Sequence, residues 1–214
     1  MDIRYERCKI LFGEDNFSKL KKAKILILGV GGVGGHTLDC LYRSGITNIT
    51  ILDYDYYDET NKNRQIGSEA IGENKIEVLQ NLYKGINIIE QKMDLVWLDK
   101  FDFTPYDIIV DSADTTKVKI ELAKREYKKL IMSLGSAKRY DSSKVEVASI
   151  WKSHGDALGK KIRYELKKAK FNRNFTVVFS PEEDKCKDKG SCIAVTGVFG
   201  LTICSEVIKR IIKT

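Results

Sequence analysis

The fold is decided by the stretch Lys24-Ile-Leu-Ile-Leu-Gly-Val-Gly-Gly-Val-Gly-Gly35. An apolar strand ends here in a turn rich in glycine, and the turn leads into a helix. Such a turn lets the backbone approach phosphate groups and directs the N-terminus of the helix at them. By itself the pattern suits NAD, FAD or any other nucleotide. We expect a nucleotide site at four glycines, which are Gly29, Gly31, Gly32 and Gly34.

An acidic residue and an arginine refine this expectation. A second apolar strand, residues 49–52, ends at Asp53, nineteen residues after Gly34. A carboxylate at this position can accept hydrogen bonds from ribose hydroxyls. Arg64 follows in a polar turn, and an enzyme that attacks a triphosphate needs such a cation, whereas hydride transfer has little use for it. The pattern therefore favours ATP chemistry over a dinucleotide.

The order of elements predicts a Rossmann-like, doubly wound α/β fold. Strand and helix patterns alternate, which favours parallel strands with ligands bound at their carboxyl ends. Two later segments, residues 144–148 and 176–179, are predicted as half-buried strands and suggest an antiparallel extension in the C-terminal half. The expected parallel strands cover residues 24–28, 49–52, 86–92, 107–111 and 130–133. The expected helices cover residues 10–20, 32–44, 75–84, 118–128, 156–170 and 190–213.

Length and composition indicate a single enzyme-sized domain. The 214 residues suit one α/β domain, with a nucleotide-binding half over 1–134 and a substrate-binding half with the C-terminal helix over 135–214. The longest apolar stretch, 192–204, is too short for a membrane span. Five cysteines, an odd number, suggest reduced thiols, and we expect a cytoplasmic protein. The net charge of +7 permits a polyanionic partner.

Displacement at an α-phosphate places negative charge on phosphate oxygens, which fixed cations and a metal stabilise. Arg64 offers a planar fork for two oxygens, and Lys75 offers a point charge at the start of a helix. Asp114 lies in a small-residue turn after a strand, where it can bind Mg²⁺. Asp111 either assists at the nucleotide or caps the next helix.

Together these motifs resemble the ubiquitin-activating-like adenylating enzymes, the ThiF/MoeB superfamily. The landmarks are the glycine turn, Asp53, Asn61-Lys-Asn63-Arg64-Gln65, Lys75, and Asp111-Ser-Ala-Asp114. The resemblance implies ATP and magnesium as cofactors, formation of an acyl-adenylate and pyrophosphate, and a homodimer. It implies that Arg7 reaches ATP across the dimer interface. It also assigns Asn61, Asn63, Gln65 and Asp111 to the nucleotide and Arg64, Lys75 and Asp114 to catalysis.

The second half is similar to the tRNA threonylcarbamoyladenosine dehydratase branch. The similar segments are residues 134–148, 156–166 and 177–182. The resemblance implies that the substrate is a modified adenosine beside a tRNA anticodon, which is closed to a cyclic form with loss of water. Because no Cys-x-x-Cys pair occurs, we expect no structural zinc.

The expected helix 156–170 carries basic residues around an apolar stripe. They suit the phosphates of the anticodon stem-loop, although a solvated basic face gives the same pattern. The candidates for tRNA contact are Lys160, Lys161, Lys167 and Lys168.

Two other functions stay open. One is an adenylyltransferase for a ubiquitin-like sulfur carrier, working with a sulfur-carrier or cysteine desulfurase system. It requires a reactive cysteine, for which Cys186 in a lysine-rich loop is the candidate. The other is an NAD-binding or non-enzymatic module, which tolerates loss of Arg64 and Asp114.

Overall fold

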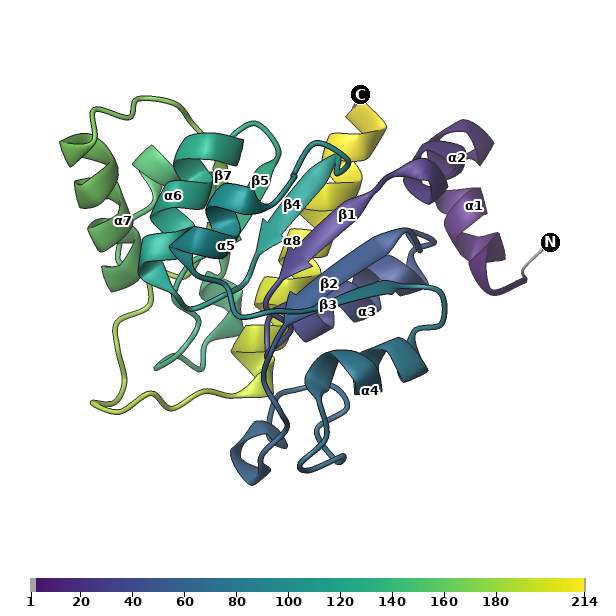
Figure 1. Ribbon diagram of the computed structural model, residues 1–214, viewed down its shortest axis with the longest axis horizontal. Helices are drawn as coiled ribbons and strands as arrows, with labels where there is room; N and C mark the ends of the chain where they lie inside the picture. Colours follow the sequence, from purple (N-terminus) through teal and green to yellow (C-terminus); the bar gives the residue numbers. More distant parts are fainter. Residues whose placement is uncertain (1–2, 214) are drawn as a thin grey trace.

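The computed structural model describes residues 3–213 as one α/β sandwich around a seven-stranded sheet (Figure 1). The strand order is β3-β2-β1-β4-β5-β7-β6, and every neighbouring pair is parallel except β6 and β7. The predicted doubly wound sheet with an antiparallel extension is therefore confirmed. The strands are β1 (Ile25–Leu28), β2 (Ile49–Asp53), β3 (Asn87–Glu90), β4 (Ile108–Asp111), β5 (Leu130–Ser133), β6 (Glu146–Ser149) and β7 (Thr176–Phe179).

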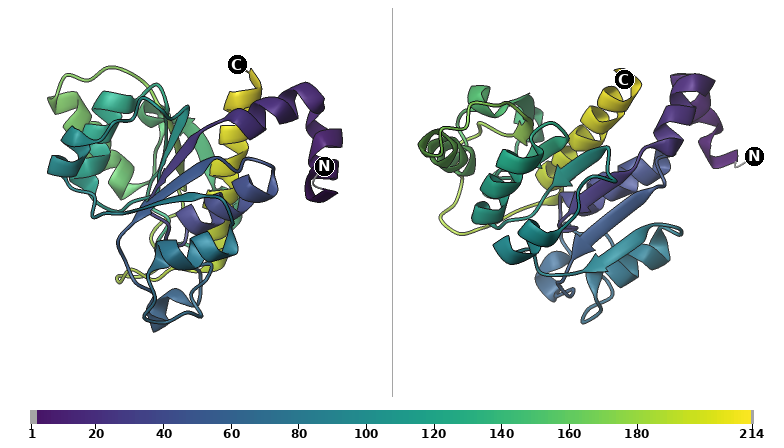
Figure 2. Two further views of the ribbon diagram at one scale, coloured as in Figure 1. Left: turned by 45° about the vertical axis from the view of Figure 1, so that its right-hand side comes forward. Right: turned by 45° about the horizontal axis from the view of Figure 1, so that its top comes forward.

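Helices cover both faces of the sheet (Figure 2). One apolar core lies between the sheet and α3, α4 and α8, and the other lies between the sheet and α5, α6 and α7. The helices are α1 (Glu6–Phe12), α2 (Glu14–Lys22), α3 (Gly34–Arg43), α4 (Lys75–Leu82), α5 (Leu95–Lys100), α6 (Thr116–Glu126), α7 (Ala157–Lys168) and α8 (Ile193–Lys213). Short 3-10 turns cover η1 (Ile3–Tyr5), η2 (Glu59–Asn61), η3 (Ser142–Lys144) and η4 (Ile150–Lys152).

The central strands are buried on both faces, which explains their continuous apolar runs. β1, β4 and β5 are buried along their whole length, as is β2 up to Asp53. Parallel strands between two helix layers require such runs. The outer strand β6 is instead exposed or half-exposed along its length.

Two elements differ from the prediction. The expected helix over 10–20 breaks at Gly13, whose positive φ of 77° separates α1 from α2. Only glycine adopts this conformation at little cost, so the chain turns there. Helix α5 was not predicted, because six residues are too few for a clear periodicity. Its N-cap is Asp94, which accepts a hydrogen bond from the Trp97 amide at 2.8 Å.

Helix α8 packs directly against α3 through a glycine. A Cβ at Gly200 would lie 2.7 Å from the Cβ of His36 and from the carbonyl oxygen of Val33. This close approach brings the N-terminal part of α8 beside the loop that carries Arg64. Although α8 has 21 residues, no helix within residues 3–213 is apolar enough over sufficient length to cross a membrane.

Candidate functional site

Two cavities adjoin at the carboxyl ends of the parallel strands. The first, of about 460 Å³, lies over the glycine turn and the ends of β1 and β2. The second, of about 540 Å³, lies between the ends of β4 and β5 and the N-termini of α7 and α8. Five residues line both cavities and so form the wall between them, namely Gly32, Arg64, Ser112, Ala113 and Asp114. A molecule bound in the first cavity and a molecule bound in the second would therefore meet at this shared wall.

The glycine turn forms one side of the first cavity. Gly29 has a φ of 81°, and a Cβ there would lie 3.0 Å from the backbone of Ala113. A Cβ at Gly34 would overlap the carbonyl oxygen of Gly29. Neither position accepts a side chain, so the turn stays tight and the helix start faces the cavity. Gly29, Gly31 and Gly32 line the cavity, whereas Gly34 supports the turn from below.

Asp53 lines the first cavity and also holds the turn in place. One carboxylate oxygen accepts a hydrogen bond from the amide of Val30 at 2.8 Å. The other accepts hydrogen bonds from the amides of Tyr54 and Asp55, at 2.8 and 3.1 Å. The oxygen bonded to Val30 has a second lone pair, so the group can also accept a bond from a ligand hydroxyl.

Two buried amide groups face the first cavity with unused acceptors. Asn61 Oδ1 and Gln65 Oε1 have no hydrogen-bond partner among the described residues. Both residues line the cavity, as predicted for this turn. A buried acceptor without a partner costs about 1–3 kcal/mol. The two amides therefore suit a ligand that brings hydrogen-bond donors, such as a nucleoside.

Arg64 is held in the wall between the cavities by its own loop. Its guanidinium donates to the carbonyl of Thr60 at 2.6 Å and to Asn63 Oδ1 at 2.8 Å. The Arg64 backbone carbonyl lies 3.1 Å from His36 Nε2, so α3 fixes the loop from below. Both hydrogen bonds use Nη1. Within residues 3–213, Nε and Nη2 of Arg64 have no hydrogen-bond partner, which leaves part of the planar fork for phosphate oxygens. No motif in the sequence indicates the His36 contact.

Lys75 is buried at the first position of α4 and lines the first cavity. Asn74 caps this helix by accepting the amide of Ile76 at 3.1 Å. The Lys75 ammonium lies 3.3 Å from Asp55 Oδ2, a carboxylate that is half-exposed. The ammonium also lies 6.0 Å from the centre of the Tyr57 ring. Its hydrogen bond to Asp55 leaves two ammonium hydrogens for a ligand at the cavity.

Asp114 is exposed and lines both cavities. The N-cap of α6 is the next residue, Thr115, so Asp114 does not serve as the cap. Residues 3–213 contain no group of three or more His, Cys, Asp or Glu side chains arranged around a metal. Mg²⁺ needs no such cage when phosphates supply the other ligands, because it binds proteins through one or two carboxylates. Asp114 therefore fits magnesium that is carried by a triphosphate.

Asp111 lines neither cavity, in contrast to the prediction that assigns it to the nucleotide. Its carboxylate is fully buried, and Oδ1 lies 3.1 Å from the Lys119 ammonium. Lys119 also donates to the carbonyls of Asp111 and Ser133, at 3.3 and 3.0 Å. Burial raises the pKa of the Asp111 carboxyl, and the Lys119 charge opposes this shift. The pair thus ties together the ends of β4 and β5 beneath the shared wall.

Two further predicted residues lie outside both cavities. Asn63 is exposed; it accepts a hydrogen bond from Arg64 and donates to the carbonyl of Ser191 at 2.8 Å. It therefore supports Arg64. It does not line the first cavity, although the sequence resemblance assigns it to the nucleotide. Arg7 is exposed on α1, which lies far from the loops at the strand ends (Figure 1). Within one chain it does not reach the site, so a role for Arg7 requires a second copy.

A buried arginine shapes the second cavity, and the sequence did not identify it. Arg139 donates to the carbonyls of Gly135, Ala137 and Glu182 at 2.9–3.0 Å. It also lies 3.3 Å from Asp156 Oδ2. Burial raises the pKa of the Asp156 carboxyl, and the hydrogen bond from the Gly159 amide opposes this.

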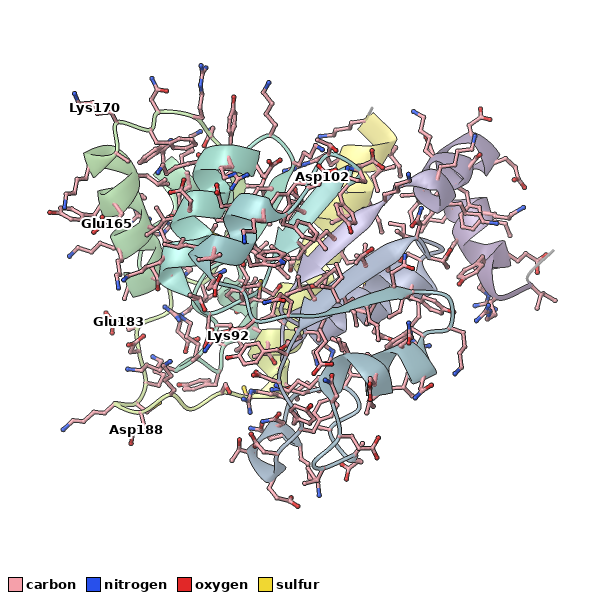
Figure 3. All side chains as sticks on the ribbon, in the orientation of Figure 1. Lys92, Asp102, Glu165, Lys170, Glu183 and Asp188 are labelled. Carbon is pink, nitrogen blue, oxygen red and sulfur yellow. The ribbon has the colours of Figure 1, made fainter. Side chains whose placement is uncertain are left out.

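The four predicted lysines of the basic helix are all exposed on α7. The opposite face of this helix packs into the core through Ile162 and Leu166. Helix α7 lies at one edge of the molecule, where the labelled Glu165 and Lys170 also lie (Figure 3). The lysines thus face solvent, and their part in binding nucleic acid stays a prediction.

All five cysteines are free, and only Cys186 is fully exposed. Its thiol donates to the carbonyl of Asp188 at 3.2 Å within the loop before α8. This loop borders the second cavity through Asp184, Lys189 and Ser191, but Cys186 does not line it.

Comparison with known proteins gives consistent matches. The model of the ThiF family matches residues 5–214. The tRNA threonylcarbamoyladenosine dehydratase of Bacillus subtilis is 32% identical over 205 residues, which cover 88% of this chain and 81% of that protein. The crystal structure of the Escherichia coli tRNA N6-threonylcarbamoyladenosine dehydratase in complex with ATP has a TM-score of 0.92 at 26% identity; the match covers 98% of this chain and 94% of that one.

A relative with a different name matches only part of the chain. The probable adenylyltransferase/sulfurtransferase MoeZ of Mycobacterium tuberculosis is 33% identical over 120 residues. These residues cover 52% of this chain and 31% of MoeZ. The similarity to the dehydratases thus extends over most of the chain, whereas the similarity to MoeZ covers about half of it.

Proposed function

Because this chain belongs to the ThiF family, we propose that it is an ATP-dependent adenylating enzyme that cyclises threonylcarbamoyladenosine in tRNA. The resemblance drawn from the sequence motifs is confirmed by the family match. The observation that carries the proposal is the shared wall, in which Arg64 and Asp114 border both cavities. ATP in the first cavity and a carboxylate in the second would meet there.

The proposed reaction has two steps. A carboxylate oxygen of the substrate attacks the α-phosphorus of ATP, the bond to the bridging oxygen breaks, and pyrophosphate leaves. A nucleophile of the same substrate then attacks the acyl carbon and displaces AMP, which keeps the former carboxylate oxygen. With release of one proton, the substrate loses the elements of water. An intramolecular nucleophile needs no residue of the protein as a covalent carrier.

The residues of the shared wall supply the electrostatics of the first step. Arg64 would stabilise the charge that develops on the non-bridging oxygens, because its guanidinium is already held in place. Lys75 would neutralise charge farther along the triphosphate. Asp114 would hold Mg²⁺, which would neutralise phosphate charge when bound.

A homodimer is part of the proposal. Arg7 lies on an N-terminal segment with three large, strongly exposed apolar side chains, Ile3, Ile10 and Leu11. Several large apolar side chains exposed on one short segment suit an interface. In a dimer, this segment would carry Arg7 toward the nucleotide of the second copy.

A cytoplasmic location fits a tRNA substrate and stays a proposal, as does the division of the chain into a nucleotide half and a substrate half.

Exchange of Cys186 for serine separates this function from the sulfur-carrier alternative, which the exposed thiol and the partial MoeZ match favour. We expect Cys186→Ser to keep substantial cyclisation activity, because the acyl-adenylate is attacked within the substrate. A carrier-activating enzyme that works through this thiol would lose its product. Mass spectrometry of the tRNA nucleosides measures the outcome, and complete loss of cyclisation would contradict the proposal.

Charge reversal on α7 tests the nucleic-acid face. The variant replaces four lysines by glutamate, namely Lys160, Lys161, Lys167 and Lys168. It should weaken tRNA binding by roughly tenfold or more. Its affinity should also depend less on salt, because each phosphate contact contributes about 0.9 to the slope of log K against log salt concentration. ATP binding should stay normal, since the first cavity lies elsewhere. The matched control reverses four exposed lysines near α2 at the far side of the molecule, Lys19, Lys21, Lys22 and Lys24. Normal cyclisation by the α7 variant would show that this face is only solvated.

A further inference from the structure

An exposed tyrosine lies at the centre of the basic face of α7. Tyr164 is 65% exposed. On a helix, the surface neighbours of a residue are those three and four positions away in each direction. For Tyr164 all four of these neighbours are exposed lysines, which are Lys160, Lys161, Lys167 and Lys168.

Tyr164 lies outside the buried face of α7. The inward face of α7 is formed by Gly159, Ile162 and Leu166, and Tyr164 lies away from it. Within residues 3–213, no side-chain hydrogen bond, ion pair or ring contact involves the tyrosine or any of the four lysines. Single exposed tyrosines are common on protein surfaces, but a ring flanked by four unpaired cations is a specific arrangement.

The arrangement suits single-stranded RNA. Lysine ammonium groups bind phosphates, and an exposed aromatic ring stacks on a base. In a duplex the faces of the bases are covered by their neighbours, whereas unpaired bases of a loop can be splayed out onto an aromatic side chain. One carboxylate, Glu165, is adjacent in sequence, but the flanking positions of the ring are uniformly positive.

We propose that Tyr164 is a stacking platform for an unpaired base of the RNA substrate, with the neighbouring phosphates bound by the four lysines. The inference rests on the proposed function and adds to it the part of the RNA that is recognised. The selected element is a loop and not a stem.

The position of α7 agrees with this assignment. The start of the helix lines the second cavity through Asp156, Ala157 and Leu158. Tyr164 lies seven residues beyond Ala157, roughly 10 Å along the helix axis. A nucleotide that reacts in the second cavity and a nearby base stacked on Tyr164 can therefore belong to one continuous loop.

The test compares Tyr164→Ala with Tyr164→Phe on two RNA probes. The first is the tRNA that carries threonylcarbamoyladenosine, and the second is a fully base-paired hairpin stem with a similar number of phosphates. We expect Tyr164→Ala to weaken tRNA binding about tenfold, the scale for removing one stacked base. Tyr164→Phe keeps the aromatic face and should bind like the wild type. Neither variant should change binding of the stem, because the lysines remain.

A Tyr164→Trp variant gives a direct signal. Its additional tryptophan fluorescence, after subtraction of a wild-type titration that reports Trp97 and Trp151, should be quenched by the tRNA and not by ATP. Wild-type tRNA affinity of Tyr164→Ala, or an equal loss on tRNA and stem, would overturn the inference. Cyclisation by the wild-type protein is measured in the same preparation. If the wild type cyclises its tRNA while Tyr164→Ala binds normally, only the stacking role fails.

Discussion

Replacing Arg64 by alanine is expected to lower the rate of AMP formation about a hundredfold or more. This is the scale for removing one preorganised group that stabilises charge in a transition state. The loop around Arg64 should persist, because His36 contacts its backbone carbonyl and not the guanidinium. Asp114→Ala should cause a comparable loss, since Asp114 is the other charged residue in the wall between the cavities. Steady-state kinetics at saturating ATP measure both effects.

Two control variants make this result specific. Arg64→Lys keeps the charge but loses the planar fork, so it should recover only part of the rate. Arg43→Ala removes an exposed arginine that pairs with Asp39 on α3, away from both cavities, and should leave the rate unchanged. A wild-type rate of AMP formation in Arg64→Ala or Asp114→Ala would show that the assigned role is wrong.

Lys119→Met is expected to destabilise the fold by about 3–5 kcal/mol, because it leaves the Asp111 carboxylate buried without its counter-charge. The carbonyls of Asp111 and Ser133 lose a donor as well. Chemical denaturation measures the free energy of unfolding. A loss below about 1 kcal/mol would contradict the structural role, since even a typical surface pair contributes up to that amount.

The double variant Asp111→Leu with Lys119→Met is the matched control. Replacement of both partners by apolar residues removes the unpaired charge, so most of the lost stability should return.

The pH dependence of Lys119→Met gives a second check. Burial raises the pKa of the folded Asp111 carboxyl above its unfolded value, so the folded state binds more protons. Stability then falls as the pH rises between the two pKa values, and the defect should shrink toward acid pH.

The fold was predictable because its signals are local. Each buried strand is an apolar run, and the glycine turn between β1 and α3 follows from backbone sterics at Gly29 and Gly34. The break at Gly13 was missed although a glycine followed by two acidic residues, Glu14 and Asp15, suits the end of one helix and the start of the next. Helix α5 is too short for its periodicity to be read.

The site was predictable only where the chain brings its residues together in order. The glycine turn, Asp53 and the turn with Arg64 follow neighbouring parallel strands or the loop after them, so their meeting at one edge follows from the topology. Asp111 was misassigned because a carboxylate at a strand end suits both a ligand and a buried partner. The informative signal was Lys119, a charged residue between the core residues Val118 and Leu122 of α6. A buried lysine requires a nearby carboxylate or carbonyls.

The second cavity could not be derived from the sequence. Arg139 lies in an irregular segment and Asp156 caps α7 17 residues later, and only the folded chain brings them within 3.3 Å. The same holds for His36, which meets the carbonyl of Arg64 across the gap between α3 and the loop. These are tertiary contacts, and no local propensity encodes them.

The most direct test of the account follows one reaction with two readouts. Purified protein is incubated with tRNA that contains threonylcarbamoyladenosine and with ATP labelled at its α-phosphate. We predict one AMP for each nucleoside that loses the mass of one water, and no conversion when ATP is omitted or replaced by NAD. AMP formation that does not depend on the modified tRNA, or an unchanged nucleoside in the presence of ATP, would contradict the proposed function.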